Sequence, residues 1–142
     1  MAIKTTVPGS GSSYVIDESF IAATQLTVAA RKNTVLAWSA QSSGKPQVTT
    51  PGGQGVLPAG VLVSDADVAS AGLAEVRMFG IVEIEAKGAF NSGILLTIQG
   101  TDGRVEAASS GDYVVGVALE ASAEAGQLVK VMINTITPPQ LN

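Results

Sequence analysis

Hydrophobic and polar residues alternate along much of the second half of this chain. The longest run is 75–87, where every even-numbered position is apolar or glycine. These positions are Val76, Met78, Gly80, Val82, Ile84 and Ala86. Successive side chains of a β-strand point to opposite faces, so the run predicts a strand with one buried face. A glycine near the middle of a strand, here Gly80, indicates a bulge or a bend.

The opposite face of this predicted strand is charged except at Phe79 and Ile81. A twisted strand that passes from one layer to another buries both of its faces at that point. Otherwise, the two side chains form an apolar patch for a partner subunit. Both explanations stay open at the level of the sequence.

Shorter strands are predicted on both sides of this run. In the segment 34–39, Leu36 shares a face with Trp38, whereas Val35 points to the other side. An Asp-Gly pair at 102–103 predicts a hairpin turn. The other predicted strands are 14–16, 25–29, 61–63, 94–99, 104–107, 113–119 and 127–134.

Three segments lack a strand pattern. Residues 1–13 are predicted to form a flexible N-terminal arm, because 8–13 consist of proline, glycine and serine. Residues 41–60 contain three prolines and five glycines and are predicted to be a long loop. Residues 138–142 begin with two prolines and form a C-terminal tail. A single β domain is therefore expected at 14–137, and the arm is either a disordered terminus or a segment that orders on a partner.

A weak internal repeat relates 60–78 to 116–132. Each copy reads as a strand, an alanine-rich connection, an Ala-Gly turn and an alternating strand. Two copies are too few for a solenoid and fit a closed or layered β-protein better. The predicted fold class is all-β: a small β-barrel or β-sandwich of short antiparallel strands, with an extended N-terminal arm and a long Pro/Gly-rich loop.

The composition removes several functional classes. The 142 residues include no cysteine and no histidine, and only 14% are charged. A chain of this length buries roughly two thirds of its unfolded surface, so it needs no disulfide or metal to fold. Thiol catalysis, zinc fingers, iron–sulfur clusters and histidine acid–base chemistry are excluded. Charged residues normally make up about a quarter of a soluble protein. The low charge therefore indicates a surface that is partly covered by other protein.

The charge pattern also bears on partners. The net charge is −4, and the eight basic residues are scattered apart from Arg31-Lys32. Phosphate binding needs clustered lysine and arginine, so we expect no direct contact with nucleic acid. No apolar run approaches the ~20 residues of a membrane-spanning helix, and the N-terminus does not resemble a signal peptide. We therefore expect synthesis in a cytoplasm and no membrane partner.

Candidate catalytic and ligand-binding patterns are weak. No Ser-x-x-Lys spacing occurs, so a histidine-free nucleophile is not indicated. Glu83 and Glu85 are typical of a solvated strand face. The Asp-Ala-Asp at 65–67 lacks the glycine and the distal glutamate of a calcium loop. The glycines of 52–55 precede Pro58 rather than a helix, and no Walker lysine follows them. We expect no enzymatic activity, no metal site and no cofactor.

One ordered set of motifs in the C-terminal half has a known parallel. Its core is Gly-Asp-Tyr-Val-Val-Gly-Val-Ala-Leu-Glu-Ala at 111–121, followed by Ala-Gly at 125–126 and Val-x-Val at 129–131. Supporting segments are 80–86, 93–97 and 102–105. This order resembles the capsid cement, or head decoration, proteins of tailed bacteriophages. The resemblance covers 61–133.

The resemblance implies a non-enzymatic protein of the virion. Such proteins bind the outer surface of an expanded capsid, commonly as homotrimers, and clamp neighbouring major capsid subunits against the pressure of packaged DNA. The implied partners are the major capsid protein and further copies of the chain, and the arm would pair with capsid strands by strand addition. Two other functions stay open: a tail, baseplate or fibre module, and a carbohydrate-binding β-module.

Large apolar residues of the arm and of the predicted strands are the candidates for a capsid or subunit interface. They are Ile3, Val7, Tyr14, Ile16, Phe20, Trp38, Phe79 and Ile81.

Overall fold

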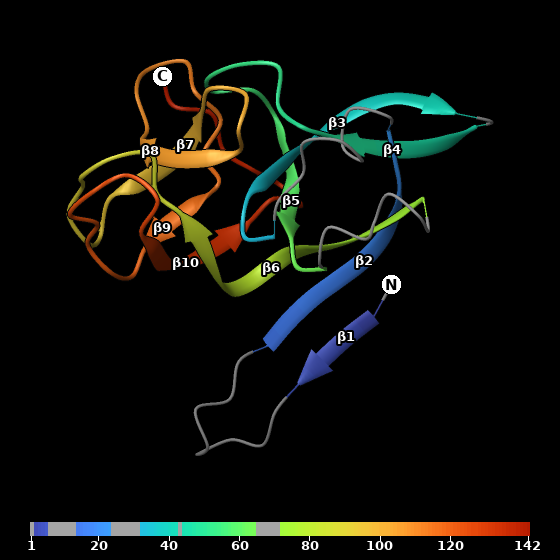
Figure 1. Cartoon of the computed structure of the whole chain (residues 1–142), viewed down its shortest axis with the longest axis horizontal. Helices are drawn as coiled ribbons and strands as arrows, with labels where there is room; N and C mark the ends of the chain where they lie inside the picture. Colours follow the sequence, from blue (N-terminus) through green and yellow to red (C-terminus); the bar gives the residue numbers. More distant parts are fainter. Residues whose placement is uncertain (1, 6–13, 24–31, 43, 65–71) are drawn as a thin grey trace.

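The computed structural model describes residues 2–5, 14–23, 32–42, 44–64 and 72–142. This part of the chain contains ten strands and no helix, which confirms the all-β class (Figure 1). The strands are β1 (Ala2–Thr5), β2 (Tyr14–Ala22), β3 (Val35–Ser42), β4 (Lys45–Thr49), β5 (Pro58–Leu62), β6 (Leu73–Glu85), β7 (Leu95–Gln99), β8 (Arg104–Ala107), β9 (Gly116–Ala118) and β10 (Leu128–Asn134). The strands predicted at 25–29 and the connection at 66–71 lie outside the described residues.

Five strands pair in a closed circuit that we call the C-terminal ring, on the left of Figure 1. In order they are β6, β10, β9, β7 and β8, and each successive pair is antiparallel. A parallel bridge between Ala86 and Val105 returns the circuit from β8 to the end of β6. There, the amide of Lys87 donates to the carbonyl oxygen of Val105 at 2.8 Å.

A second circuit, the N-terminal ring, shares strand β6 with the first. Its order is β2, β4, β3, β5 and β6, and β6 pairs again with β2. The β2–β4 pair is parallel, and the other pairs of this ring are antiparallel. The prediction of antiparallel strands therefore holds for every named strand pair of the described residues except this one. The sequence left a barrel and a sandwich open, and the pairings form two rings around one common strand.

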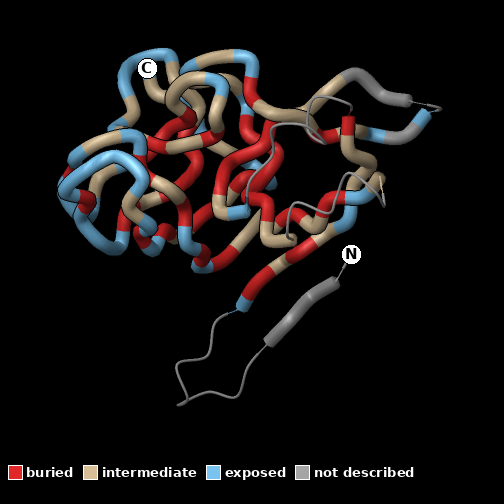
Figure 2. Tube along the Cα trace, viewed as in Figure 1, coloured by how far each residue is buried: buried red, intermediate tan, exposed pale blue. Residues whose placement is uncertain are grey.

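Each ring surrounds its own apolar cluster. All five strands of the C-terminal ring contribute to one cluster, and Leu36, Val48, Leu62 and Val76 belong to the other. The alternation within 34–39 is confirmed, because Val35 packs in the first cluster and Leu36 in the second. The buried parts of the trace gather inside the C-terminal ring and along β5 and β6 (Figure 2).

Strand β6 passes from one cluster to the other at Gly80. Ala74 and Val76 face the N-terminal cluster, whereas Val82 and Ile84 face the C-terminal cluster. Gly80 has a φ of 114°, which L-residues with a side chain rarely adopt. A Cβ at this position would lie 2.6 Å from the carbonyl oxygen of Tyr14. The glycine therefore lets the strand change direction and lets β2 approach closely.

The segment 41–60 differs from the predicted loop, because it contains β4 and the start of β5. Pro46 lies where the β3–β4 register shifts between Gln47 and Lys45, so its missing amide breaks no regular ladder. Pro58 is the first residue of β5, another position that tolerates proline. Composition alone therefore overestimated this loop, which is confined to 50–57.

The strand predicted at 113–119 is shorter in the structure, where β9 covers Gly116–Ala118. The preceding residues bond to other partners. The amide of Val114 donates to the carbonyl oxygen of Pro139 at 2.8 Å, and that of Gly111 donates to Leu141 at 2.7 Å. The C-terminal tail at 138–142 thus runs alongside 111–114 and is held by main-chain hydrogen bonds.

A charged cluster lies beside the junction of β6 and β8. The Lys87 ammonium lies 3.0 Å from the Asp102 carboxylate. The Arg104 guanidinium lies 3.5 Å from Glu85 and 3.8 Å from Asp102. These contacts join the end of β6 to the turn that precedes β8. They add a polar connection to the single bridge that closes the C-terminal ring.

Neutralising Asp102 tests how much this cluster contributes to stability. Burial raises the pKa of Asp102, but hydrogen bonds from Lys87 and the Arg104 amide and the charges of both residues outweigh it and lower the pKa. A lowered folded pKa stabilises the protein above the unfolded pKa, and the stabilisation is lost as pH falls through the folded value. We expect Asp102→Asn to lower the free energy of unfolding at neutral pH by less than about 1 kcal/mol, since the pair is partly exposed. Urea denaturation of the natural chain and of Asp102→Asn, at neutral pH and at about pH 3, measures the loss of stability. The loss should be smaller at the lower pH. If the two proteins differ in free energy of unfolding by the same amount at both pH values, the charge of Asp102 does not stabilise the fold.

Candidate partner interface

Four apolar side chains form a row across the outside of the C-terminal ring, which we call the outer strip. Ile81 of β6 lies opposite Met132 of β10. Met132 lies opposite Val117 of β9, and Val117 lies opposite Leu95 of β7. Their strand neighbours, such as Val82, Val131 and Leu96, are buried in the core, so alternation turns the row outward. Ile81 is 38% exposed and Leu95 is 40% exposed.

The outer strip continues at the β2 side of β6 through an aromatic pair. The rings of Tyr14 and Phe79 meet edge to face, with centroids 6.3 Å apart. Ile16 lies opposite Phe79, and Ile3 of β1 lies opposite Ile16 in the β1–β2 register. Five of the eight residues predicted as interface candidates therefore lie on neighbouring strands: Ile3, Tyr14, Ile16, Phe79 and Ile81.

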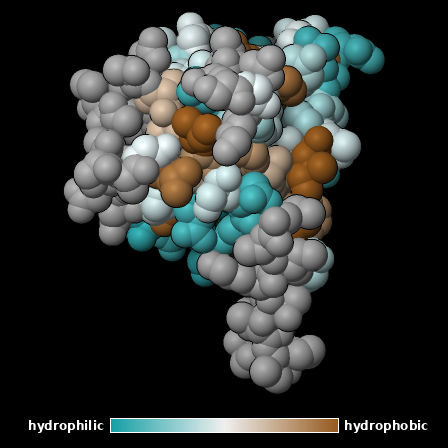
Figure 3. Space-filling model, turned by 90° about the vertical axis from the view of Figure 1, so that its right-hand side faces the viewer, coloured by the Kyte–Doolittle hydropathy of each residue, from teal (hydrophilic) through white to brown (hydrophobic). Residues whose placement is uncertain are grey.

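The other candidates lie elsewhere. Phe20 and Trp38 pack edge to face with centroids 5.0 Å apart, and both pack against the N-terminal cluster. Val7 lies outside the described residues. The end of the molecule that carries β3 and β4 shows hydrophobic groups among hydrophilic ones (Figure 3). Among the described residues, Leu57 and Leu73 are strongly exposed.

An ion pair between β2 and β6 lies next to the Ile81 end of the outer strip. The Arg77 Nε donates to Asp17 Oδ1 at 2.9 Å, and Nη2 donates to Oδ2 at 3.3 Å. The Asp17 carboxylate is almost fully buried. Arg77 Nη1 also donates to the carbonyl oxygen of Ile81 at 3.0 Å, across the bend at Gly80. The ion pair thus positions the backbone that carries Ile81.

One pair of opposite charges lies next to the β6–β10 part of the outer strip. Glu83 of β6 lies opposite Lys130 of β10, one row away from the Ile81–Met132 pair. On the other side of that pair, Phe79 lies opposite Asn134, an uncharged residue. At the Ile81–Met132 pair, the strip is therefore bordered by one pair of opposite charges, although the whole chain carries a net charge of −4.

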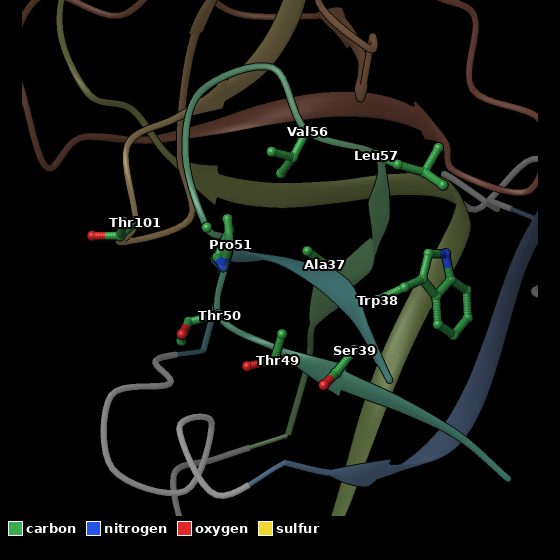
Figure 4. A pocket seen from close by; sticks show the side chains of 10 residues that line it. Ala37, Trp38, Ser39, Thr49, Thr50, Pro51, Val56, Leu57 and Thr101 are labelled. Carbon is green, nitrogen blue, oxygen red and sulfur yellow. The ribbon is translucent and has the colours of Figure 1, made fainter. Parts of the chain in front are cut away.

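A shallow pocket opens between β3, β4 and the 50–57 loop (Figure 4). It has a volume of about 690 Å³ and no charged residue in its lining, which includes Ser39, Thr49 and Thr101. The Trp38 ring points away from Thr50 and Pro51 in Figure 4. Trp38 is the only aromatic residue of the lining, and its ring also packs edge to face with Phe20. A sugar-binding site commonly combines an exposed aromatic face with charged or amide side chains, and a lining with one aromatic residue and no charged residue does not favour the carbohydrate-binding alternative.

The sequence did not predict three residues of the outer strip as interface residues: Met132, Val117 and Leu95. A signal for Met132 was present, since it alternates with the apolar Val131 and Ile133 in the strand predicted at 127–134. No single strand shows that these residues form a row, because the row depends on the pairing of four strands.

Among the described residues, no group of acidic side chains is arranged to hold a metal ion. No helix long and apolar enough to cross a membrane occurs in the same part of the chain.

Comparisons with known proteins agree with the fold and the motifs. The sequence matches the phage cement protein family over residues 42–133. The structure resembles the N-terminal base of the head fibre protein gp8.5 of bacteriophage phi29, with a TM-score of 0.63 and 22% identity, covering 90% of this chain and 98% of that one. No curated protein matches significantly. Because the family match spans well over half of the sequence, this chain belongs to the phage cement protein family and is a structural, virion-associated protein.

Proposed function

We propose that this protein binds the outer surface of an expanded phage capsid and clamps neighbouring major capsid subunits. The clamp stabilises the head against the internal pressure of packaged DNA. The family match over 42–133 is the observation that carries this proposal. The low charged fraction and the exposed outer strip support it, since both are expected of a protein whose surface meets other subunits. The protein acts without catalysis and without direct contact with nucleic acid or membrane.

The first strand provides a means of attachment. Among the described strands, β1 pairs with β2 and stands at one end of the strand order, so its second edge is not paired with any of them. An edge strand offers a row of main-chain donors and acceptors to a strand of another protein. We assign residues 1–13 as the attachment arm of a β domain at 14–137, with a short tail at 138–142. In a homotrimer, three such arms convert weak contacts into firm attachment.

Co-sedimentation with phage particles tests the proposed function. The purified chain is mixed with expanded heads and with procapsids, and bound protein is quantified after centrifugation. We expect saturable binding to expanded heads and weaker binding to procapsids. Heads with bound protein should also resist heating longer than bare heads. Failure to bind either particle, together with equal stability of heads that lack the protein, refutes the proposal.

Deleting residues 1–13 tests the arm. We expect head affinity to fall roughly 10-fold or more, because each bound copy loses its strand addition. The far-ultraviolet circular dichroism and the melting temperature should change little, since β1 lies outside both rings. A matched control keeps the length of the arm but replaces residues 2–5 with Gly-Ser-Gly-Ser, which have poor strand propensity. If this control binds heads as well as the natural chain, strand addition by β1 is wrong.

A further inference from the structure

Strand β3 is covered by its two neighbours over different lengths. Its pairing with β4 extends from Ala37 to Ser42, whereas its pairing with β5 ends at Ala37. Among the described strands, no partner therefore lies along the β5 side of β3 from Trp38 to Ser42, which we call the open edge. An open strand edge presents main-chain donors and acceptors with which an extended segment can pair.

The chain that precedes β5 is anchored elsewhere. Pro58 begins β5, and the residues just before it do not belong to a strand. The amide of Gly55 donates to the carbonyl oxygen of Ile98 at 3.0 Å, and the amide of Tyr113 donates to the carbonyl oxygen of Gly55 at 3.1 Å. Both main-chain groups of Gly55 thus bond to segments outside the N-terminal ring, and the 50–57 loop does not extend β5 along the open edge.

The shallow pocket lies where β3 and this loop separate (Figure 4). Ala37, Trp38 and Ser39 line one side of it, and Val56 and Leu57 line the other. Its volume of about 690 Å³ falls within the ~300–1,000 Å³ of typical ligand sites. A segment that is added at the open edge therefore finds space for its side chains next to β3.

The lining of the pocket selects against charge. It contains no charged residue, and the hydroxyl-bearing Ser39, Thr49, Thr50 and Thr101 accompany the apolar Leu57, which is 41% exposed. A charged side chain that entered the pocket would lose water without gaining a partner of opposite charge. The segment that fits is uncharged, and β-branched residues such as valine and threonine also favour the extended backbone that the open edge requires.

We propose that the open edge of β3 and its pocket bind an extended, uncharged segment of another protein. The segment adds as a strand beside β3 and places every second side chain in the pocket, next to Ala37 and Ser39. This site is separate from β1, which has its own unpaired edge at one end of the strand order. The inference therefore does not depend on the proposed attachment to the capsid.

Titration of the isotope-labelled natural chain with a short peptide, followed by two-dimensional NMR, tests the site. The probe is acetyl-Thr-Val-Thr-Val-Thr-amide, which is uncharged and prefers an extended backbone. We expect saturable shifts of the amide signals at 38–42 and in the 50–57 loop, with a dissociation constant on the order of 1 mM.

Two N-methylated forms of the probe test strand addition itself. One carries methyl groups on the amides of both valines, and the other on the amides of the three threonines. Along a strand, alternate residues direct their amides to opposite edges, so one of these two sets faces β3. At least one methylated peptide should therefore bind more than 10-fold more weakly. If both bind as well as the unmodified probe, the segment does not add as a strand.

A pair of serine variants locates the probe. Ser39→Glu places a charge in the lining and should weaken binding at least 10-fold. Ser92→Glu is the matched control, because Ser92 is exposed in the turn before β7 and does not line the pocket. The control should bind like the natural chain, and both variants should keep the natural circular dichroism spectrum and melting temperature. Equal binding by Ser39→Glu overturns the proposal.

Three further results would each exclude the proposed occupant. The absence of a saturable shift up to about 5 mM probe overturns the proposal. Shifts at 38–42 that depend on protein concentration without the probe assign the edge to a second copy. Shifts caused by the neutral sugar maltotriose, but not by the peptide, assign the pocket to carbohydrate. Head binding is measured separately, so the inference and the proposed function can fail independently.

Discussion

Replacing Asp17 with alanine will lower the free energy of unfolding by about 3–5 kcal/mol, the usual cost of removing one partner of a buried ion pair. The Asp17 carboxylate is almost fully buried and accepts two hydrogen bonds from the Arg77 guanidinium. Its loss leaves a partly buried positive charge without this partner between β2 and β6. Urea denaturation followed by tryptophan fluorescence measures the effect, because Trp38 packs in the cluster of the same ring.

Two further variants separate the ion pair from simple loss of packing. Asp17→Asn keeps the shape and one acceptor oxygen, so it should retain part of the stability. In the double variant of Asp17→Ala with Arg77→Ala, the total loss should be smaller than the sum of the single losses. Asp102→Ala removes a partly exposed pair and should cost less than about 1 kcal/mol. If Asp17→Ala costs no more than Asp102→Ala, the pair does not hold β2 to β6.

Replacing Gly116 with alanine will destabilise the protein by more than about 3 kcal/mol, because the added methyl group has no space. A Cβ at Gly116 would overlap the Met132 carbonyl oxygen and lie 2.9 Å from the Ile133 Cα. Both are main-chain atoms of β10, so no side-chain rotation relieves the contact. Strand β9 would have to move away from β10, which would weaken the hydrogen bonding of the three residue pairs between these strands.

Gly88 provides the control for this substitution. A Cβ at Gly88 would meet no atom within 4 Å, and its φ is not in the left-handed region. Gly88→Ala should therefore change the free energy of unfolding by no more than about 0.5 kcal/mol. Thermal denaturation of both variants makes the comparison. If Gly116→Ala melts with the natural chain, β9 and β10 are not packed as closely as described.

Local pattern predicted β6 and the opposite facing of Val35 and Leu36 well, because both follow directly from alternation along one strand. The bend at Gly80 also came from the sequence, since glycine inside a strand has few other causes. The prolines of 41–60 led to a predicted loop that is too long. Pro46 lies at an irregular strand position and Pro58 at the start of a strand, and both positions tolerate proline.

The candidate interface was only partly predictable. Phe79 and Ile81 drew attention as apolar residues on a charged strand face, and they do lie on the outer surface. Phe20 and Trp38 looked equally suitable, and both are partly buried where they pack against each other and against the N-terminal cluster. The row that joins Ile81 to Leu95 depends on four strand registers, and such long-range pairing leaves no trace in any single segment. The bridge between Ala86 and Val105, which closes the C-terminal ring, could not be predicted either, because it also joins residues far apart in the sequence.

Strand β6, which the two rings share, can also transmit force from one ring to the other. A pull on β1 passes to β2 through their four residue pairs, and from β2 to β6 along their common length. Strand β6 then carries the load past Gly80 into β10 through seven further pairs. When force acts along paired strands, their hydrogen bonds are strained together in shear rather than broken one after another. If the arm is attached to a capsid, as we propose, force on the arm would load β6, which is the longest described strand and is anchored in both cores.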